Sequence, residues 1–298
     1  MITATDDSRR AGVLIQADQL HRRLGEPGLV VLDAQVDLPT PRFDGDYRVR
    51  SGHDAWLQAR IPGSRHADLV DALSSPHPSL TFMRPRPEAL AQALSLLGVG
   101  VGAHVVVHDR SDGFWAARLW WMLRWIGVDA TVLDGGWRAW CAAGLAQESG
   151  PPVPVAAPAP VVVVVEQARD GFWADRADVE RALRADDPPT LVCALGADLF
   201  AGRAPSRYAR RGHLPGSLNV PARHLLDAEG RYLPTAELAR ALSALDPERP
   251  VLLYCGGGIS AAVDALALTL IGRDDARIYD GSLQEWAANP ELPLQTLE

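Results

Sequence analysis

The chain has 298 residues, a length typical of two domains. Hydrophobic residues make up 47% and charged residues 22%, so the composition is close to the globular average and excludes wholesale disorder. The formal net charge of -8 argues against the broad basic surface that binding to nucleic acid or to an anionic membrane requires. A local basic pocket for a small anion is compatible with this charge.

The cysteines and the apolar stretches indicate a reducing, aqueous compartment. Cys141, Cys193 and Cys255 are too few and too scattered for a disulfide framework, and they form no CxxC pair for zinc. The N-terminal stretch lacks the apolar core of a signal peptide, and the apolar stretch Leu119–Gly127 is far shorter than the roughly 18 residues of a membrane span. We expect a cytoplasmic protein with no metal, no organic cofactor, and neither nucleic acid nor a membrane as its partner.

In the first half, short apolar runs alternate with helical patterns. The run Val105–His108 is typical of a buried strand, and a glycine-containing turn separates it from a helical pattern over Ala116–Trp125. A further strand, Thr131–Leu133, ends in an Asp-Gly turn. The tryptophans of the helical pattern recur at near-helical spacing and predict packing in the core or at a domain interface: Trp120, Trp121 and Trp125.

The segment between residues 151 and 165 differs in composition from both halves. It is rich in proline, which restricts φ and removes backbone donors, so we expect an extended linker rather than a helix. Its last residues, Val161–Val165, are expected to form an edge strand of the domain that follows.

The second half repeats the order of elements of the first. Val251–Tyr254 is a predicted strand, Ser260–Leu270 a predicted helix, and Arg277–Tyr279 a strand that ends in an Asp-Gly turn. Strands that alternate with helices of this length predict parallel sheets. The fold class is therefore α/β, with two copies of an open, mostly parallel sheet that carries helices on both faces.

Matching motifs at one spacing indicate an internal duplication. Three pairs of residues share an offset of 146 positions: Asp109 and Cys255, Asp134 and Asp280, Trp140 and Trp286. We expect a first domain over residues 10–150, the linker over 151–165 and a second domain over 166–298.

The most informative local pattern is the run Cys255-Gly256-Gly257-Gly258-Ile259-Ser260, which joins a predicted strand to a predicted helix. Ligand sites in open α/β sheets lie beyond the carboxyl ends of strands. Successive glycines allow a tight loop whose N–H groups, together with the helix N-terminus, form a cradle for an anion. Such a cradle stabilises the thiolate of Cys255, which predicts a nucleophile that needs no histidine base.

The loop has three other interpretations. Cys255 is a buried structural cysteine if the turn is an ordinary one. A Walker-type phosphate loop needs Lys followed by Ser or Thr after its last glycine, and here Ile259 follows Gly258. A cysteine phosphatase needs an arginine at the position that Ala261 occupies, so that interpretation fails.

With these motifs, the chain resembles the tandem rhodanese-type sulfurtransferases over nearly its whole length. The second half carries the motifs GHLPGS (residues 212–217), YCGGGISA (254–261) and YDGS (279–282), and the first half carries IPG (61–63) and LDGGW (133–137). The resemblance implies that the first domain is catalytically silent, because Asp109 stands at its cysteine position and cannot accept sulfur.

The family implies a two-step sulfur transfer. Cys255 takes the outer sulfur of a small-molecule donor as a persulfide and passes it to cyanide, a thiol or a thioredoxin-like acceptor, with the loop from Gly256 to Ser260 as the anion-binding substrate site. The uncharged loop resembles that of members acting on 3-mercaptopyruvate, which is the donor we favour, although Gly257 replaces a serine that some of them use to relay a proton. The alternatives are thiosulfate:cyanide transfer and a non-catalytic rhodanese-like binding module.

One departure from the family concerns the substrate arginine. The first strand of the catalytic domain in this family usually carries an arginine that binds the donor, and Leu195 stands at that position here. Other cations must replace it, and four arginines are candidates: Arg203, Arg207, Arg210 and Arg211. Arg207 is preferred, because its loop approaches the active site in relatives.

The remaining polar residues have structural explanations. Cys193 is either a second thiol that relays sulfur or inert packing on a buried strand, and Cys141 is expected to be structural. His213 is expected to tie a loop to the sheet, whereas nothing in the sequence fixes the position of His66. Asp280, in its Asp-Gly turn, is expected to cap a helix.

Overall fold

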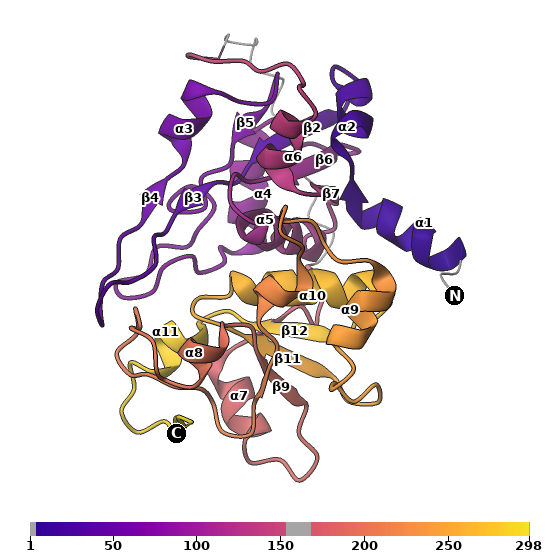
Figure 1. The fold of residues 1–298 in the computed structure, drawn as a ribbon. Coiled ribbons are helices and arrows are strands. Elements are labelled where there is room, and N and C mark those ends of the chain that lie inside the picture. Colours follow the sequence, from indigo (N-terminus) through magenta and orange to yellow (C-terminus); the bar gives the residue numbers. More distant parts are fainter. Residues whose placement is uncertain (1–3, 153–167, 298) are drawn as a thin grey trace.

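The computed structural model describes residues 4–152 and 168–297, which are called the first half and the second half below. Each half contains one five-stranded sheet, and the two sheets lie one above the other in Figure 1 with helices between them. The predicted linker and the predicted edge strand Val161–Val165 fall almost entirely outside the described residues.

The two sheets share one topology, which confirms the duplication predicted from the sequence. The first sheet has the order β1 (Leu14–Ile15), β7 (Asp129–Leu133), β6 (His104–His108), β2 (Leu29–Asp33) and β5 (Arg65–His66). The second has the order β8 (Trp173–Ala174), β12 (Ala276–Tyr279), β11 (Val251–Tyr254), β9 (Thr190–Cys193) and β10 (Leu218–Asn219). All pairings within both sheets are parallel, so the predicted α/β class is correct.

The helices follow the strands in both halves. The first half contains α1 (Ala4–Val13), α2 (Ala17–Arg23), α3 (His53–Gln58), α4 (Pro87–Leu96), α5 (Phe114–Trp125) and α6 (Gly136–Ala142). The second half contains α7 (Arg176–Ala182), α8 (Ala197–Phe200), the 3-10 helix η1 (Ala222–Leu225), α9 (Thr235–Ala241), α10 (Ser260–Leu270) and α11 (Ser282–Trp286). A short antiparallel pair, β3 (Val36–Asp37) and β4 (Arg50–Ser51), extends from the first half.

Alternation along the strands of the first sheet explains why helices cover both of its faces. Val105 and Val107 of β6 join the large core that both halves share, whereas Val106 packs into a separate cluster with Leu20 of α2 and Trp140 of α6. Successive strand residues point to opposite faces, so an uninterrupted valine run supplies both cores.

The interface between the halves is built mainly by α5 and α10, which pack against each other (Figure 1). Both helices are almost entirely buried, because each covers its own sheet on one side and the other helix on the opposite side. Trp121 contacts Phe172 with ring centroids 4.5 Å apart, and Trp125 contacts Trp173 at 5.9 Å. The tryptophans of α5 are therefore core and interface residues, as their spacing predicted.

None of the helices in residues 4–152 and 168–297 combines the length and the hydropathy needed to cross a bilayer. Within the same residues, no group of three or more His, Cys, Asp or Glu side chains is placed to hold a metal ion.

Candidate active site

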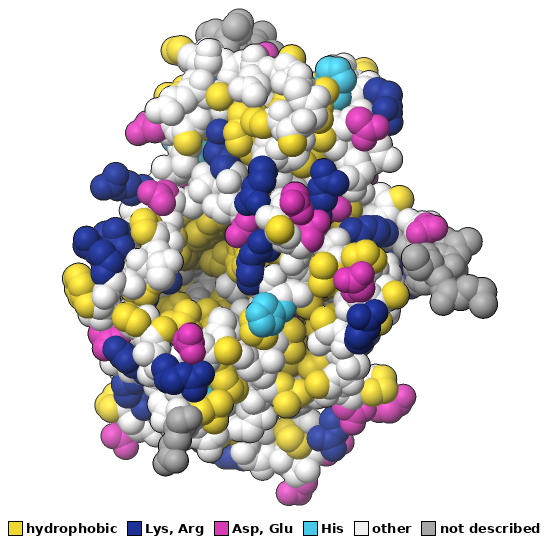
Figure 2. Space-filling view, viewed as in Figure 1, with side chains coloured by type: hydrophobic (Ala, Val, Ile, Leu, Met, Phe, Trp, Pro, Cys, Tyr) yellow, Lys and Arg dark blue, Asp and Glu magenta, His cyan; other side chains and the backbone are white. Residues whose placement is uncertain are grey.

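A cavity of about 300 Å³ lies between the two halves, at the carboxyl ends of the strands of both sheets. Figure 2 shows the hollow on the surface, with hydrophobic side chains on its walls. Six of the seven site residues predicted from the sequence line it: Cys255, Gly256, Gly257, Ile259, Ser260 and Arg207. The seventh, Gly258, faces away from the cavity, toward α5 of the first half.

Cys255 follows β11 directly, and its backbone is hydrogen-bonded to Ser282, the first residue of α11. Its N–H donates to Ser282 Oγ at 3.2 Å, and Ser282 Oγ donates in turn to the carbonyl of Tyr279 at 2.7 Å. Ser282 has φ of 48°, a strained value for a residue other than glycine, and such strain is typical of functional sites. The side chain of Cys255 is only 1% exposed and lies at the bottom of the cavity. Ser282 belongs to the motif YDGS, but nothing in the sequence indicates that its hydroxyl supports Cys255.

Each glycine of the loop has a different neighbour. A Cβ on Gly256 would collide with the hydroxyl of Tyr208, so that ring packs directly on the backbone of the loop. A Cβ on Gly257 would lie 3.6 Å from Gln284 Oε1, which is ordinary contact. Gly258 has φ of +77°, and its Cβ would lie 2.8 Å from Arg118 Nη1. Within the described part of the chain, the N–H groups of these glycines donate to no protein acceptor.

The corresponding loop of the first half contains a carboxylate in place of a thiol. The two carboxylate oxygens of Asp109 accept four amide hydrogen bonds at 2.9 to 3.0 Å, and the donors are Ser111, Gly113, Trp115 and Ala116. Burial raises the pKa of Asp109, and these amide bonds oppose that rise. The first half thus demonstrates that a loop at this point of the sheet gathers amides around one negative group.

Shifted by the offset of 146, the four donors to Asp109 correspond to Gly257, Ile259, Ala261 and Ala262 of the second half. The helices that follow the loops, α5 and α10, begin at equivalent residues, Phe114 and Ser260. The left-handed glycine falls one position earlier in the second loop, at Gly258 rather than at the equivalent of Gly113. The two loops therefore lead into equivalent helices, but the position of the left-handed glycine, and with it the backbone turn, differs between them.

The loop over residues 255–260, called the cysteine loop below, is contacted by an arginine of the first half on the side that faces away from the cavity. Arg118 of α5 is 1% exposed, and its Nη2 donates to Asp280 Oδ1 at 2.6 Å and to the carbonyl of Phe82 at 2.7 Å. Asp280 also accepts the backbone N–H of Arg84 at 2.9 Å. The prediction that Asp280 caps a helix is wrong: α11 starts after Gly281 without a side-chain cap, because Asp280 is turned toward the arginine of the other half.

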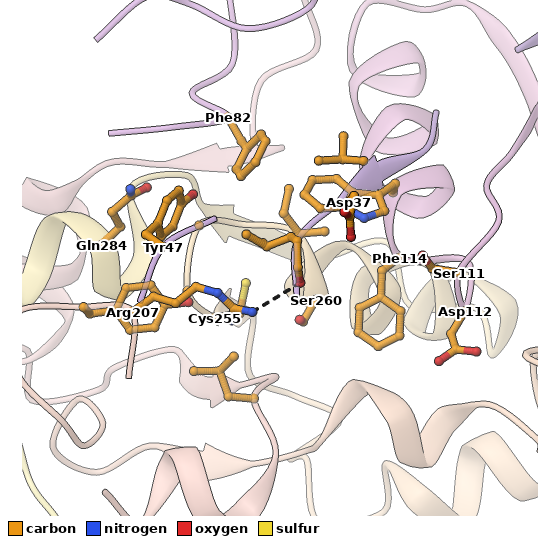
Figure 3. Close-up of a pocket in the computed structure, with 18 of the residues that line it drawn as sticks. Asp37, Tyr47, Phe82, Ser111, Asp112, Phe114, Arg207, Cys255, Ser260 and Gln284 are labelled. Carbon is orange, nitrogen blue, oxygen red and sulfur yellow. Dashed lines mark hydrogen bonds between the residues drawn. The ribbon is translucent and has the colours of Figure 1, made fainter. Parts of the chain in front are cut away.

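Of the four candidate arginines, only Arg207 lines the cavity. Figure 3 places its guanidinium beside Cys255, where Nη2 donates to the carbonyls of Leu38 and Pro39 while Nε is buried without a partner among the described residues. The other three serve elsewhere: Arg203 pairs with Asp198, Arg210 binds carbonyls of the C-terminal segment, and Arg211 pairs with Asp44.

Aromatic and amide side chains from both halves complete the cavity. Tyr47 bonds to Thr81, and Gln284 Oε1 accepts from the Thr81 backbone N–H at 3.1 Å, so a polar chain crosses between the halves beside the loop. Burial, together with the nearby Cys255 sulfur, raises the pKa of Tyr208 well above its usual value. Tyr208 therefore stays protonated at neutral pH and can donate a hydrogen bond.

The other cysteines lie outside the cavity. Cys193 is fully buried on β9, and burial raises its pKa to about 12, which supports the packing interpretation over a sulfur relay. Cys141 is exposed on α6, where the neighbouring Trp140 takes the buried position and Gln147 Nε2 lies 3.5 Å from the Cys141 sulfur.

The histidines likewise lie apart from the chemistry. The ring of His213 stacks on Phe200, and its Nδ1 lies 2.8 Å from the Phe200 carbonyl. The backbone N–H of His213 donates to the backbone carbonyl of Gln295. His213 thus ties its loop to α8 and to the C-terminal segment, and the next residue, Leu214, bonds to Tyr254 of the sheet. His66 lies on β5 against His53 and does not line the cavity.

Comparisons with known proteins match both halves of the chain. A family model described as the rhodanese-like domain matches residues 16–143 and again residues 187–289. A probable 3-mercaptopyruvate sulfurtransferase of Pseudomonas aeruginosa is 34% identical over 302 residues, which cover 95% of this chain and 98% of the relative. A putative thiosulfate sulfurtransferase of Mycobacterium tuberculosis is 32% identical and covers 96% of this chain and 97% of its own length.

Among solved structures, the 3-mercaptopyruvate sulfurtransferase SseA of Escherichia coli superposes with a TM-score of 0.76 at 30% identity. The match covers 90% of this chain and 98% of that one, so it includes both sheets and the interface between them.

Proposed function

The chain belongs to the rhodanese family and is a sulfurtransferase, and from that premise we propose that it moves sulfane sulfur from 3-mercaptopyruvate, through a persulfide on Cys255, to a thiol acceptor. One observation carries the assignment of Cys255: it stands in a loop whose counterpart in the first half surrounds the carboxylate of Asp109 with four amides. A loop of this kind stabilises a negative charge. At the position equivalent to Asp109, the second half carries the thiol of Cys255, which bears a negative charge when it ionises.

In the first step, the thiolate of Cys255 attacks the sulfur of the donor. The carbon–sulfur bond breaks, its electron pair remains on the carbon, and the proton of the donor's thiol passes to that carbon to give pyruvate. Gly257 has no hydroxyl group for this proton transfer, whereas Ser260 and Tyr208 bring hydroxyl groups to the cavity wall. Arg207, which lines the cavity, supplies the positive charge that binds the carboxylate of the donor.

In the second step, an acceptor thiolate attacks the outer sulfur of the persulfide and leaves Cys255 as a thiolate. The loop amides of Gly256, Gly257, Gly258, Ile259 and Ser260 stabilise the charge that the outer sulfur carries between the two steps. We place the protein in the cytoplasm, with a small thiol or a thioredoxin-like protein as acceptor and cyanide as a laboratory substitute.

The test is a mass measurement after incubation with the donor. One sulfur atom should be added to the peptide that contains Cys255, and cyanide should remove it. Cys255→Ser should abolish the addition, and Cys141→Ser, which removes the exposed cysteine, should leave it intact. An unmodified protein under every donor would count against catalysis and favour a binding module.

Thiosulfate is the second candidate donor, since the mycobacterial relative is named for it. The ratio of kcat/KM for 3-mercaptopyruvate and for thiosulfate decides between the two donors.

A further inference from the structure

Two tyrosines line the cavity, and their hydroxyl groups differ in what they contact. The hydroxyl of Tyr47, which Figure 3 labels, bonds to Thr81 of the first half. Tyr208 of the second half donates its backbone N–H to Ser206 Oγ at 3.0 Å, whereas its hydroxyl bonds to no protein group in the part of the chain that the structure describes. A tyrosine hydroxyl that is shielded from bulk water normally has a partner. The hydroxyl of Tyr208 is therefore available to a molecule in the cavity.

The position of this hydroxyl explains the first glycine of the cysteine loop. Gly256 does not have a left-handed φ, so its backbone conformation does not require glycine. The hydroxyl oxygen of Tyr208 occupies the place that a Cβ on Gly256 would take. Glycine is needed at this position because the tyrosine oxygen fills the space of a side chain, one residue from Cys255.

Contacts with the first half hold Tyr208 in this position. Ser206, which accepts the N–H of Tyr208, is buried. The N–H of Ser206 donates to Asp44 Oδ1 at 2.9 Å, and its carbonyl accepts the N–H of Gly45 at 2.8 Å. The backbone thus fixes the ring of Tyr208, and its hydroxyl is not used for that purpose.

The hydroxyl of Tyr208 lies close to the two groups that hold the donor. Burial raises the pKa of Tyr208, a negative charge on Cys255 raises it further, and the cation of Arg207 lowers it. Cys255 and Arg207 lie beside each other in Figure 3. A 3-mercaptopyruvate molecule with its sulfur at Cys255 and its carboxylate at Arg207 has its CH₂ carbon between them. That carbon is the atom that needs a proton when the carbon–sulfur bond breaks.

We infer that Tyr208 delivers the proton to this carbon, an inference that rests on the proposed function. As the thiolate of Cys255 forms the bond to the donor's sulfur, the carbon–sulfur bond breaks and its electron pair remains on the carbon. The hydroxyl of Tyr208 gives its proton to the carbon, and the phenolate that results takes the proton of the donor's thiol. One persulfide anion and one pyruvate are formed, and Tyr208 is again protonated. The total charge is unchanged, and the carbon keeps the electron pair that the sulfur gives up, so no oxidant or reductant is consumed.

A phenol is suited to this step because it does not neutralise the nucleophile. A thiol is a stronger acid than a phenol, so a thiolate beside Tyr208 leaves the phenolic proton in place. The carbanion is a much stronger base than a thiolate and takes the proton. Ser260, at the start of α10, also brings a hydroxyl to the cavity wall, but an aliphatic hydroxyl is a weaker acid than a phenol.

Removing the hydroxyl separates proton transfer from nucleophilic attack. Tyr208→Phe keeps the ring and should lower kcat for persulfide formation from 3-mercaptopyruvate by about a hundredfold, while KM changes by less than about threefold. Alkylation of Cys255 by iodoacetamide uses the same thiolate and needs no proton transfer, so its rate should stay within about twofold of that of the unaltered protein. Tyr232→Phe is the matched control: it removes a buried hydroxyl that has no partner among the described residues and lies outside the cavity, and it should change neither reaction.

The outcomes distinguish this inference from the proposed function. A fall in kcat of less than about tenfold, or a loss that appears in Ser260→Ala instead, would overturn the role of Tyr208. An equal fall in both reactions of Tyr208→Phe would show that the ring only shapes the loop, and would overturn it as well. In each of these cases 3-mercaptopyruvate still yields the persulfide with the unaltered protein, so the function stands. If the unaltered protein forms no persulfide with 3-mercaptopyruvate, the function fails and the role of Tyr208 fails with it.

Discussion

Replacing Arg118 by methionine should both destabilise the protein and slow sulfur transfer, although Arg118 does not line the cavity. Its guanidinium and the Asp280 carboxylate are 1% and 5% exposed and lie 2.6 Å apart. Removing one partner of such a buried pair typically costs about 3 to 5 kcal/mol, because the other charge is left without compensation. Asp280 keeps the backbone N–H of Arg84 at 2.9 Å and a longer ion pair with Arg84 Nε at 4.0 Å, so the lower end of that range, about 3 kcal/mol, is expected.

At about 2 to 4 °C per kcal/mol, the melting temperature should fall by roughly 6 to 12 °C in scanning calorimetry. Arg124→Met is the matched control on the same helix. Arg124 pairs with Asp274 at 2.6 Å and donates to Thr269 Oγ1 at 2.9 Å, but Asp274 is 62% exposed and stays hydrated when Arg124 is removed, so this loss should cost about 1 to 2 kcal/mol. A melting temperature of Arg118→Met close to that of Arg124→Met would refute the reasoning.

The catalytic consequence follows from the contact with Gly258. Without Arg118 the loop loses its support, and kcat for persulfide formation should fall by roughly a hundredfold, while KM changes less. Arg118→Lys, which keeps the charge, should recover part of kcat. Adding Asp280→Asn to Arg118→Met should recover part of the stability but not of kcat. Recovery of both together would show that Arg118 acts on the fold alone.

Three further predictions concern single residues. Gly258→Ala should impair persulfide formation far more than Gly257→Ala, because only the first combines a left-handed φ with a neighbour 2.8 Å from the new Cβ; equal losses would contradict the assigned geometry. Asp264 is buried on α10 without a hydrogen-bond partner among the described residues, and burial raises its pKa well above 3.8. The native state then holds a proton that the unfolded state releases, so stability should fall by about 1.4 kcal/mol per pH unit between the two pKa values. Asp264→Asn should remove that slope in urea unfolding followed upward from pH 4, and an unchanged slope would exclude Asp264 as its origin. In a Cys141→Ser background, iodoacetamide at pH 7 should modify Cys255 and spare Cys193, whose pKa of about 12 keeps it a thiol; labelling of Cys193 in the native protein would contradict its burial.

The fold was predictable because its signals are local and repeated. In each half an apolar run followed by a glycine turn predicts a strand followed by a helix. The offset of 146 positions, shared by Asp109 and Cys255 with two other pairs, joins the two halves into one pattern. The cysteine loop was predictable for the same reason, since a cysteine followed by three glycines constrains the chain within a few residues. Arg207 was predicted because, in the family that the chain resembles, the corresponding loop approaches the active site.

The rest of the site depends on contacts between residues distant in the sequence. Arg118 lies on α5, and the residues next to it in the sequence are apolar. Nothing near it in the sequence indicates that it reaches Asp280, 162 positions away. The Asp-Gly turn signalled a helix cap for Asp280, but its carboxylate binds a buried cation of the other half, and amides of the first turn of α11 donate instead to the carbonyls of Cys255 and Gly256. Phe82 and Tyr47 carry no local signal at all, because their place in the cavity is set by how the two halves pack.

The structure of the protein with sulfur bound to Cys255 tests the account most directly. The outer sulfur atom should lie within hydrogen-bonding distance of the amide nitrogens of Gly257 and Ile259, the two loop residues that are counterparts of donors to Asp109. An outer sulfur directed away from these amides, toward the hydrophobic walls of the cavity, would contradict it.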